Sequence, residues 1–218
     1  MRDIIELSAP DLAAMLCSRV CHDLINPVGA IGNGLEALDD PAQKEMADMA
    51  QDLIKNAARQ SLAKLEFARL AYGASSTAGT QFDTRECGRV AALLFDIEKA
   101  DLDWRVNPVM VPKNKGKLLM NMLIITAGAV PRGGVVTVAL TGEPGREIID
   151  IKATSMAEKK QKTLIPSGIE GLLAGNPEEG VDARSIQPFY CGLLARMVDM
   201  KVKVTLQDAV FSFTATPN

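Results

Sequence analysis

The chain of 218 residues is long enough to bury a substantial hydrophobic core in one or two domains. Its formal net charge of −3 argues against nucleic acid or an anionic membrane as the main partner. No apolar run approaches membrane-spanning length, and the first residues lack the basic and apolar regions of a signal peptide. We therefore expect a soluble, cytoplasmic protein.

The first predicted element is a long helix. Ser8 is a suitable N-cap, Pro10 lies in the first turn, and the helical periodicity continues to Leu38. Apolar residues recur every three or four positions and form one stripe, which consists of Cys17, Val20, Leu24, Val28, Ile31, Leu35 and Leu38.

The only histidine of the chain, His22, lies on this helix. At about 100° per residue it projects to nearly the opposite side from the apolar stripe, where it shares a polar face with Ser18 and Asn26. Pro27 has no N–H for the carbonyl of Asp23, so the helix is predicted to bend just beyond His22. We therefore expect an exposed imidazole beside a helix bend.

A second helix is predicted to begin with Asp40 as its N-cap and Pro41 in its first turn, and to continue to Tyr72. The two helices form an antiparallel hairpin. Because a hairpin alone cannot bury so long an apolar stripe, we predict a homodimer in which residues 8–72 of two copies make a four-helix bundle.

The four cysteines, Cys17, Cys21, Cys87 and Cys191, form no CxxC motif. Cys17 and Cys21 are close enough to share a metal with His22, but they lie on the stripe side of the helix and His22 points away. Neither a zinc ribbon nor a thioredoxin-like site is indicated. We predict small buried thiols that pack as apolar side chains.

The small and polar residues 73–79 are typical of a linker, which divides the chain into a hairpin domain, 1–74, and a second domain, 75–218. The second domain alternates helices with strand pairs but has no strict βαβ repeat, so the fold class is α+β with a C-terminal α/β sandwich. The expected helices are 83–99, 115–130, 169–173 and one within 182–200, and the expected strands are 102–106, 135–141, 147–154, 201–206 and 210–214.

Residues 22–27, His-Asp-Leu-Ile-Asn-Pro, resemble the H-box of bacterial sensor histidine kinases. The order of elements after the linker resembles the ATP-binding (Bergerat) domain of the same kinases. Residues 117–123 are similar to the start of its asparagine-bearing helix, and residues 189–204 to its last helix and strand. The resemblance thus covers nearly the whole chain.

Three nucleotide-binding features of the kinases are missing. Ile125 replaces the second asparagine of the asparagine-bearing helix, and residues 150–155 lack the glycines of the Asp-x-Gly-x-Gly motif. A glycine-rich loop should precede the last helix, but residues 187–192 contain a proline, which has no donor N–H, and two aromatic residues. We therefore predict a degenerate domain that does not bind ATP.

A chain with an H-box and a dimerising hairpin but no ATP site cannot phosphorylate itself, yet it can pass on a phosphoryl group. In this it resembles the dimeric histidine phosphotransferases of alphaproteobacterial cell-cycle phosphorelays. The resemblance implies that His22 receives a phosphoryl group from the receiver aspartate of a hybrid histidine kinase and passes it to response regulators that control the cell cycle. The receiver would supply Mg²⁺, so no metal site or cofactor of its own is expected.

The resemblance also assigns roles near His22. Asp23 matches the acid that orients the imidazole and offsets its charge, although a solvating carboxylate is an equal alternative. Asn26 matches a residue that can orient water for phosphatase action, and it could equally be a surface amide. Residues that could contact the receiver are Ser18, Arg19, Ile25, Arg59 and Lys64.

Two other functions remain open. One is an active autokinase with an atypical nucleotide loop, which nucleotide binding would reveal. The other is a non-catalytic dimeric scaffold with an incidental histidine, which a His22→Ala variant that still supports signalling would favour.

Overall fold

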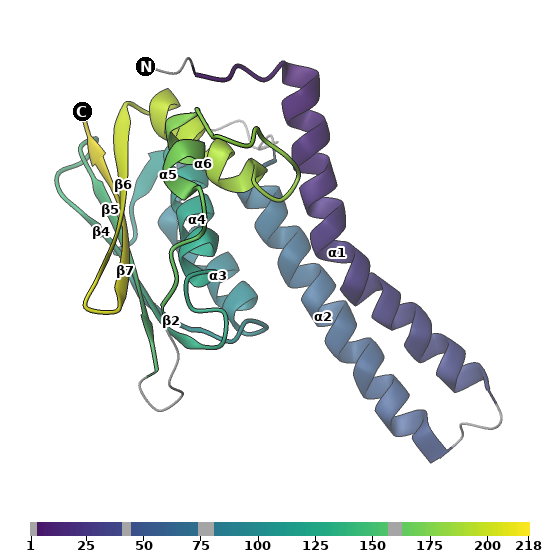
Figure 1. Ribbon diagram of the computed structural model, residues 1–218. Coiled ribbons are helices and arrows are strands. Elements are labelled where there is room, and N and C mark those ends of the chain that lie inside the picture. The colour runs from purple at the N-terminus through teal and green to yellow at the C-terminus, as the bar shows by residue number, and fades with distance from the viewer. Residues whose placement is uncertain (1–3, 41–44, 74–80, 157–162) are drawn as a thin grey trace.

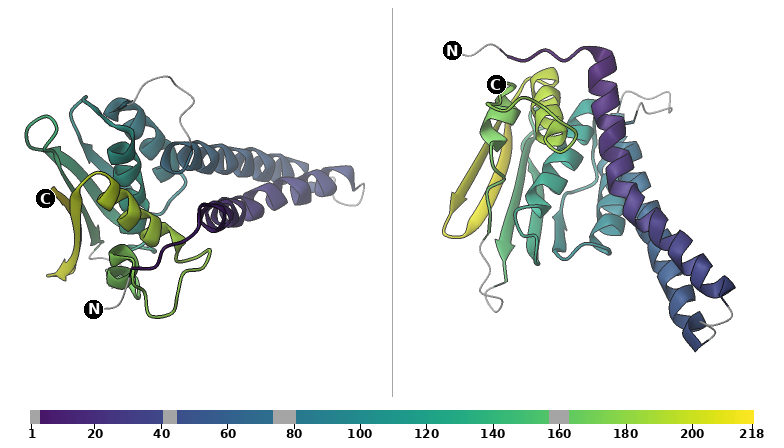
Figure 2. Two further views of the ribbon diagram at one scale, coloured as in Figure 1. Left: turned by 90° about the horizontal axis from the view of Figure 1, so that it is seen from above. Right: turned by 45° about the vertical axis from the view of Figure 1, so that its right-hand side comes forward.

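The computed structural model describes residues 4–40, 45–73, 81–156 and 163–218, and it has the predicted mixture of helices and sheet. A helical hairpin lies beside a sheet that is covered on one face by helices (Figures 1 and 2). The three layers are therefore hairpin, helices and sheet. In the described part of the chain, no helix is long and apolar enough to cross a membrane.

The hairpin consists of α1 (Ala9–Asp39) and α2 (Ala47–Ala71). As predicted, the side chain of Ser8 caps α1 by accepting a hydrogen bond from the backbone N–H of Asp11. Pro27 is buried inside α1, and Figure 1 shows the helix changing direction about halfway along.

The start of the second helix differs from the prediction. Asp40 has an extended backbone and ends α1, and α2 begins only at Ala47. Its N-cap position is Met46, whose side chain makes no capping hydrogen bond. The predicted position of Pro41 lies outside the described residues.

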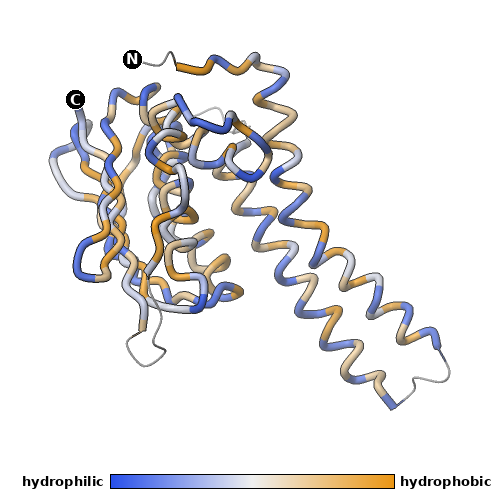
Figure 3. The backbone as a smooth tube through the Cα atoms, viewed as in Figure 1, coloured by the Kyte–Doolittle hydropathy of each residue, from blue (hydrophilic) through white to orange (hydrophobic). Residues whose placement is uncertain are grey.

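The apolar stripe of α1 meets two different environments, because α2 can cover only one side of the helix. Val20 and Leu24 are partly buried, whereas Val28 and Leu35 are 52% and 50% exposed. Apolar residues recur along both helices of the hairpin, including its projecting tip (Figure 3). Exposed large apolar side chains lie on α1 and α2 at Ile25, Val28, Leu35, Met49, Leu53, Leu62 and Leu65.

The cysteines divide in the same way. Cys87 and Cys191 are fully buried, as predicted, but Cys17 and Cys21 are exposed in the single chain. The prediction of four buried thiols was wrong for this pair, since their side of α1 faces away from α2.

The second half of the chain contains a five-stranded sheet in the order β2-β4-β5-β7-β6. β2 pairs with β4 in parallel and the other neighbours are antiparallel, which gives the predicted mixed sheet. A separate two-stranded ladder, β1–β3, was not predicted. The strands are β1 (Gln81–Asp83), β2 (Asp101–Arg105), β3 (Met110–Pro112), β4 (Gly134–Thr141), β5 (Ile148–Ser155), β6 (Met200–Gln207) and β7 (Val210–Pro217).

Four helices complete this half and agree with the prediction apart from their ends. They are α3 (Thr84–Phe95), α4 (Lys113–Ala127), α5 (Ile169–Ala174) and α6 (Ile186–Met197). Asp83 caps α3 through its carboxylate, which accepts from the backbone N–H of Arg85. Apolar side chains of α4 such as Leu118 pack in one core with Ile151 and Phe213 of the sheet.

The hairpin is attached to this half by the segment before α1, by apolar side chains in the first turns of α1, and by the end of α2. The segment before α1 is held by a hydrogen bond from the Ile5 N–H to the Gly175 carbonyl, at 2.8 Å. The end of α2 contributes Phe67, Leu70 and Ala71 to the main core. The predicted linker, residues 73–79, lies outside the described residues apart from Gly73, and so does the predicted boundary at 74/75, so the division into domains stays a prediction.

Candidate functional site

His22 is an exposed nucleophile on α1. Its side chain is 64% exposed, and its Nδ1 lies 3.4 Å from Oδ1 of Asp23. A carboxylate only accepts hydrogen bonds, so this contact favours the tautomer that carries the proton on Nδ1. The lone pair on Nε2 is then available to an electrophile.

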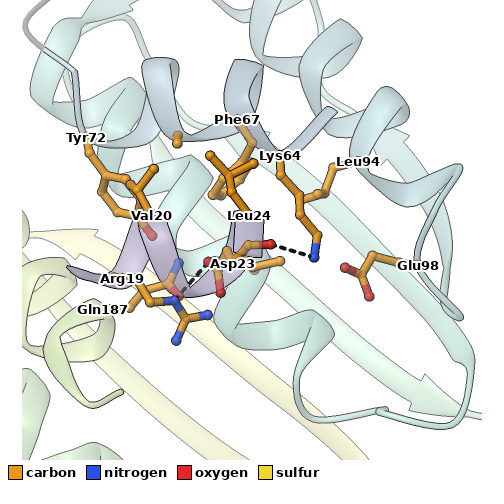
Figure 4. A pocket seen from close by; sticks show the side chains of 12 residues that line it. Arg19, Val20, Asp23, Leu24, Lys64, Phe67, Tyr72, Leu94, Glu98 and Gln187 are labelled. Atoms are coloured by element: carbon orange, nitrogen blue, oxygen red, sulfur yellow. Dashed lines mark hydrogen bonds and ion pairs between the residues drawn. The ribbon is translucent and has the colours of Figure 1, made fainter. Parts of the chain in front are cut away.

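Asp23 connects His22 to the rest of the hairpin. Its Oδ2 accepts a hydrogen bond from Nε of Arg19 at 2.9 Å, one helical turn earlier. Its backbone carbonyl accepts one from Nζ of Lys64 on α2, at 3.1 Å (Figure 4). Asp23 is therefore held at both its side chain and its backbone.

The other predicted site residues divide into two groups. Ser18, Asn26 and Arg59 are exposed, and Ile25 is 66% exposed, so all four are accessible in the single chain. Arg19 and Lys64, in contrast, are turned toward Asp23. The charged group of each therefore already has an intramolecular partner in the residue next to His22.

A small cavity of about 100 Å³ lies behind Asp23, between the hairpin and the second half of the chain (Figure 4). Sequence reasoning missed three of its polar residues, which come from distant segments: Tyr72, Glu98 and Gln187. No local pattern could have identified them, since only the tertiary fold brings them to α1. Burial raises the pKa of the Tyr72 hydroxyl well above its ordinary value, so this group stays neutral.

Asn121, which the resemblance matches to the first asparagine of the kinase helix, has a fully buried side chain. Its Nδ2 donates to the carbonyl of Ala71 at 3.2 Å and to that of Lys117 at 2.9 Å. The amide thus fastens the end of α2 to α4. Its Oδ1 is buried without a hydrogen-bond partner.

The segment that the resemblance matches to the glycine-rich loop does not precede the last helix, as predicted, but lies within it. Residues 187–192 belong to the first turns of α6, and Phe189 and Tyr190 are both buried. The ring of Tyr190 lies 6.0 Å from that of Tyr72 at the end of α2. These aromatic side chains fill the interior with apolar packing.

No group of three or more His, Cys, Asp or Glu side chains suited to a metal ion occurs among the residues that the structure describes. The expectation that Mg²⁺ comes from a partner stays a prediction.

Comparison with known proteins gives concordant matches. The family model described as "Histidine phosphotransferase C-terminal domain" matches residues 84–210. The protein phosphotransferase ChpT of Brucella abortus (strain 2308) is 46% identical over 212 residues, which cover 95% of this chain and 97% of the relative.

Among solved structures, a bacterial phosphotransferase superposes with a TM-score of 0.88 and 41% identity, covering 98% of this chain and all of the other. The Acinetobacter baumannii histidine kinase AdeS aligns over 90% of this chain, but with a TM-score of 0.42 and 10% identity. The second match is too distant to support an argument.

Proposed function

The chain belongs to the histidine phosphotransferase family and is therefore a transferase, and we propose that it relays phosphoryl groups between receiver domains through His22. The observation that carries the proposal is the exposed imidazole of the only histidine, backed at Nδ1 by a carboxylate. An exposed nucleophile suits a substrate that is itself part of another protein, because the two surfaces must meet at the reacting atoms.

The proposed reaction is an in-line displacement. The Nε2 lone pair of His22 attacks the phosphorus of a receiver's aspartyl phosphate, so that a P–N bond forms while the P–O bond to the aspartate breaks. The aspartate leaves as a carboxylate. Asp23 holds the proton on Nδ1 and offsets the positive charge that the ring gains. The reverse reaction transfers the group to the next receiver.

Asn26 is proposed to act beside the reacting atoms, because its exposed amide lies about one turn beyond His22 on the same face of α1. Ser18, Ile25 and Arg59 are proposed to contact the docked receiver. We expect the donor to be the receiver of a hybrid kinase, the acceptors to be cell-cycle response regulators, and the exchange to take place in the cytoplasm. Mg²⁺ would be bound by the receiver.

ATP is not proposed as the phosphoryl donor, because the residues at the corresponding positions do not fit a nucleotide. The side chain of Asn121 is fully buried, with its Nδ2 bound to two carbonyl groups, so its Oδ1, the atom that would bind a magnesium ion, is enclosed in the protein interior. Residues 187–192, which the resemblance matches to the phosphate-binding loop, lie inside α6, where Phe189 and Tyr190 are buried. An autokinase would require these side chains to leave the core.

We further propose a homodimer through the hairpin. Its exposed apolar side chains include Met49, Leu62 and Leu65 of α2, which are 67%, 62% and 51% exposed. A four-helix bundle of two hairpins would cover such side chains. Replacing Leu62 by glutamate should therefore convert a dimer into a monomer in light scattering, whereas a wild type that is already monomeric at micromolar concentration would contradict this proposal.

The relay is tested by following labelled phosphate. The purified protein is mixed with a phosphorylated receiver or with ATP and Mg²⁺, and a His22→Gln variant serves as the control. We expect acid-labile label only from the receiver and only on the wild type. Label from ATP alone would identify an autokinase. A wild type that takes no label from any receiver of its own organism would favour the scaffold.

A further inference from the structure

The backbone of α1 has an unfilled hydrogen-bonding position directly after the reactive histidine. In a regular helix the carbonyl of Asp23 would accept from the N–H of residue 27, but residue 27 is proline, which has none. The proline is buried, and the carbonyl of Asp23 takes part in a partly buried contact with α2, so it is shielded from water on that side.

Lys64 supplies the missing donor from the other helix. Its Nζ lies 3.1 Å from the Asp23 carbonyl oxygen, across 41 positions of sequence. The side chain is partly buried in the cavity, where Figure 4 shows its ammonium group directed at this oxygen. A hydrogen bond from an ammonium group is stronger than one from a neutral donor.

We propose that Lys64 is a positioning residue for phosphoryl transfer, which holds the peptide group of Asp23 at the proline break and thereby sets the geometry of His22. This inference rests on the proposed function of His22. It gives Lys64 a role different from that of a receiver contact, because the ammonium group acts on the protein's own backbone.

The path from Lys64 to the imidazole is short. The carbonyl that Lys64 binds belongs to the same residue whose carboxylate faces Nδ1 of His22. Arg19 fixes the other carboxylate oxygen. A movement of the Asp23 backbone would therefore change the direction of the carboxylate and of the imidazole together, and a misplacement of about 1 Å can reduce a reaction rate about 100-fold.

The test compares three variants of the full chain. Lys64→Met keeps the length and the apolar stem but removes the ammonium group, and Lys64→Arg restores a charged donor. Lys55→Met is the matched control, since Lys55 lies on the same helix, is 69% exposed and pairs with Asp52 one turn away. Each is titrated with a phosphorylated receiver, and the rate constant at saturation is separated from the half-saturating concentration.

We expect Lys64→Met to lower the saturating rate constant about tenfold or more, with the half-saturating receiver concentration unchanged within twofold. Lys64→Arg should recover most of the rate, and Lys55→Met should match the wild type. An increase in the half-saturating concentration at an unchanged rate constant would overturn the inference in favour of a receiver contact. Equal rates for Lys64→Met and Lys55→Met would also overturn it.

If the wild type takes no label from a phosphorylated receiver, the proposed function of His22 is wrong, and the role of Lys64 that rests on it is wrong as well.

A second measurement covers the case in which Lys64→Met loses its fold. Alanine at position 27 restores an N–H for the Asp23 carbonyl, so Lys64→Met should lower the urea midpoint at most half as much in a Pro27→Ala background. Equal losses in the two backgrounds would contradict the pairing of Lys64 with the proline break.

Discussion

Replacing Asn121 tests whether its side chain now fastens two helices together. The amide is fully buried and its Nδ2 faces two carbonyl oxygens, those of Ala71 and Lys117. We compare Asn121→Leu, which is apolar and of similar size, with Asn121→Asp, which has nearly the same shape but no N–H when ionised. The two variants separate loss of a donor from burial of a charge.

The structure predicts that Asn121→Asp loses more unfolding free energy than Asn121→Leu. With leucine, the Lys117 carbonyl keeps its helical partner, the backbone N–H of residue 121, and the unpartnered Oδ1 is removed. Only the carbonyl of the buried Ala71 loses its donor, which costs about 1–2 kcal/mol of unfolding free energy. An ionised aspartate would place a buried charge against two acceptors, at a cost of about 3–5 kcal/mol.

The aspartate variant should also depend on pH. The carbonyl oxygens and burial would raise the pKa of the new carboxyl in the folded state above its unfolded value of about 4. Between these two values the folded state holds a proton that the unfolded state has lost, so stability falls as the pH rises through this window. Relative to the wild type, the loss at pH 7 should therefore shrink as the pH is lowered toward 4.

Urea unfolding followed by far-UV circular dichroism at pH 7 and pH 5 measures both effects. We expect Asn121→Asp to be less stable than Asn121→Leu at pH 7 and to recover part of the difference at pH 5. Equal stability of the two variants at pH 7, or a difference that does not change with pH, would show that the amide is not enclosed by carbonyl groups. The wild type at each pH is the reference.

Three further predictions follow from other contacts. Gly34→Ala should destabilise the hairpin in the same urea assay, because the new Cβ would lie 2.6 Å from the Ile54 side chain and 3.2 Å from the Ala50 carbonyl oxygen. Gly29→Ala, whose Cβ would have nothing within 4 Å, should instead raise the free energy of unfolding by about 1 kcal/mol. Iodoacetamide at pH 8 should label no more than two of the four thiols, as counted by mass spectrometry, because burial raises the pKa of Cys87 to about 12 and also raises the pKa of Cys191. Labelling of more than two thiols in the folded protein would contradict the burial of these two. Asp23→Asn should lower the rate of transfer to His22 about 10²-fold or more at saturating receiver, and an unchanged rate would reduce Asp23 to a solvating carboxylate.

Much of this protein follows from local patterns in the sequence. The periodicity of apolar residues predicts the hairpin, and turn residues and alternation predict the five-stranded sheet and its covering helices. The polar face around His22 predicts an exposed imidazole, and Pro27 predicts the bend. Each of these depends on residues that are neighbours along the chain, so propensity and spacing are sufficient.

Other features depend on which segments meet, and a sequence pattern does not contain this information. The contact of Lys64 with the Asp23 carbonyl requires one particular register between two helices. The burial of Asn121 against Ala71 requires α2 to end on α4. Cys17 and Cys21 were predicted to be buried because a stripe shows that one side of a helix is apolar, but not how much of it one neighbouring helix can cover.

The sequence by itself determined that the only histidine lies on the polar face of the first helix, beside the carboxylate of Asp23. Only the tertiary structure decided what the surrounding residues do, because Arg19 and Lys64 were candidates for receiver contacts until the fold brought an internal partner within hydrogen-bond distance of each. A charged side chain looks the same in the sequence whether it binds an external partner or a group of its own chain. Its role is set by the acceptor it faces, and that acceptor can lie anywhere in the chain.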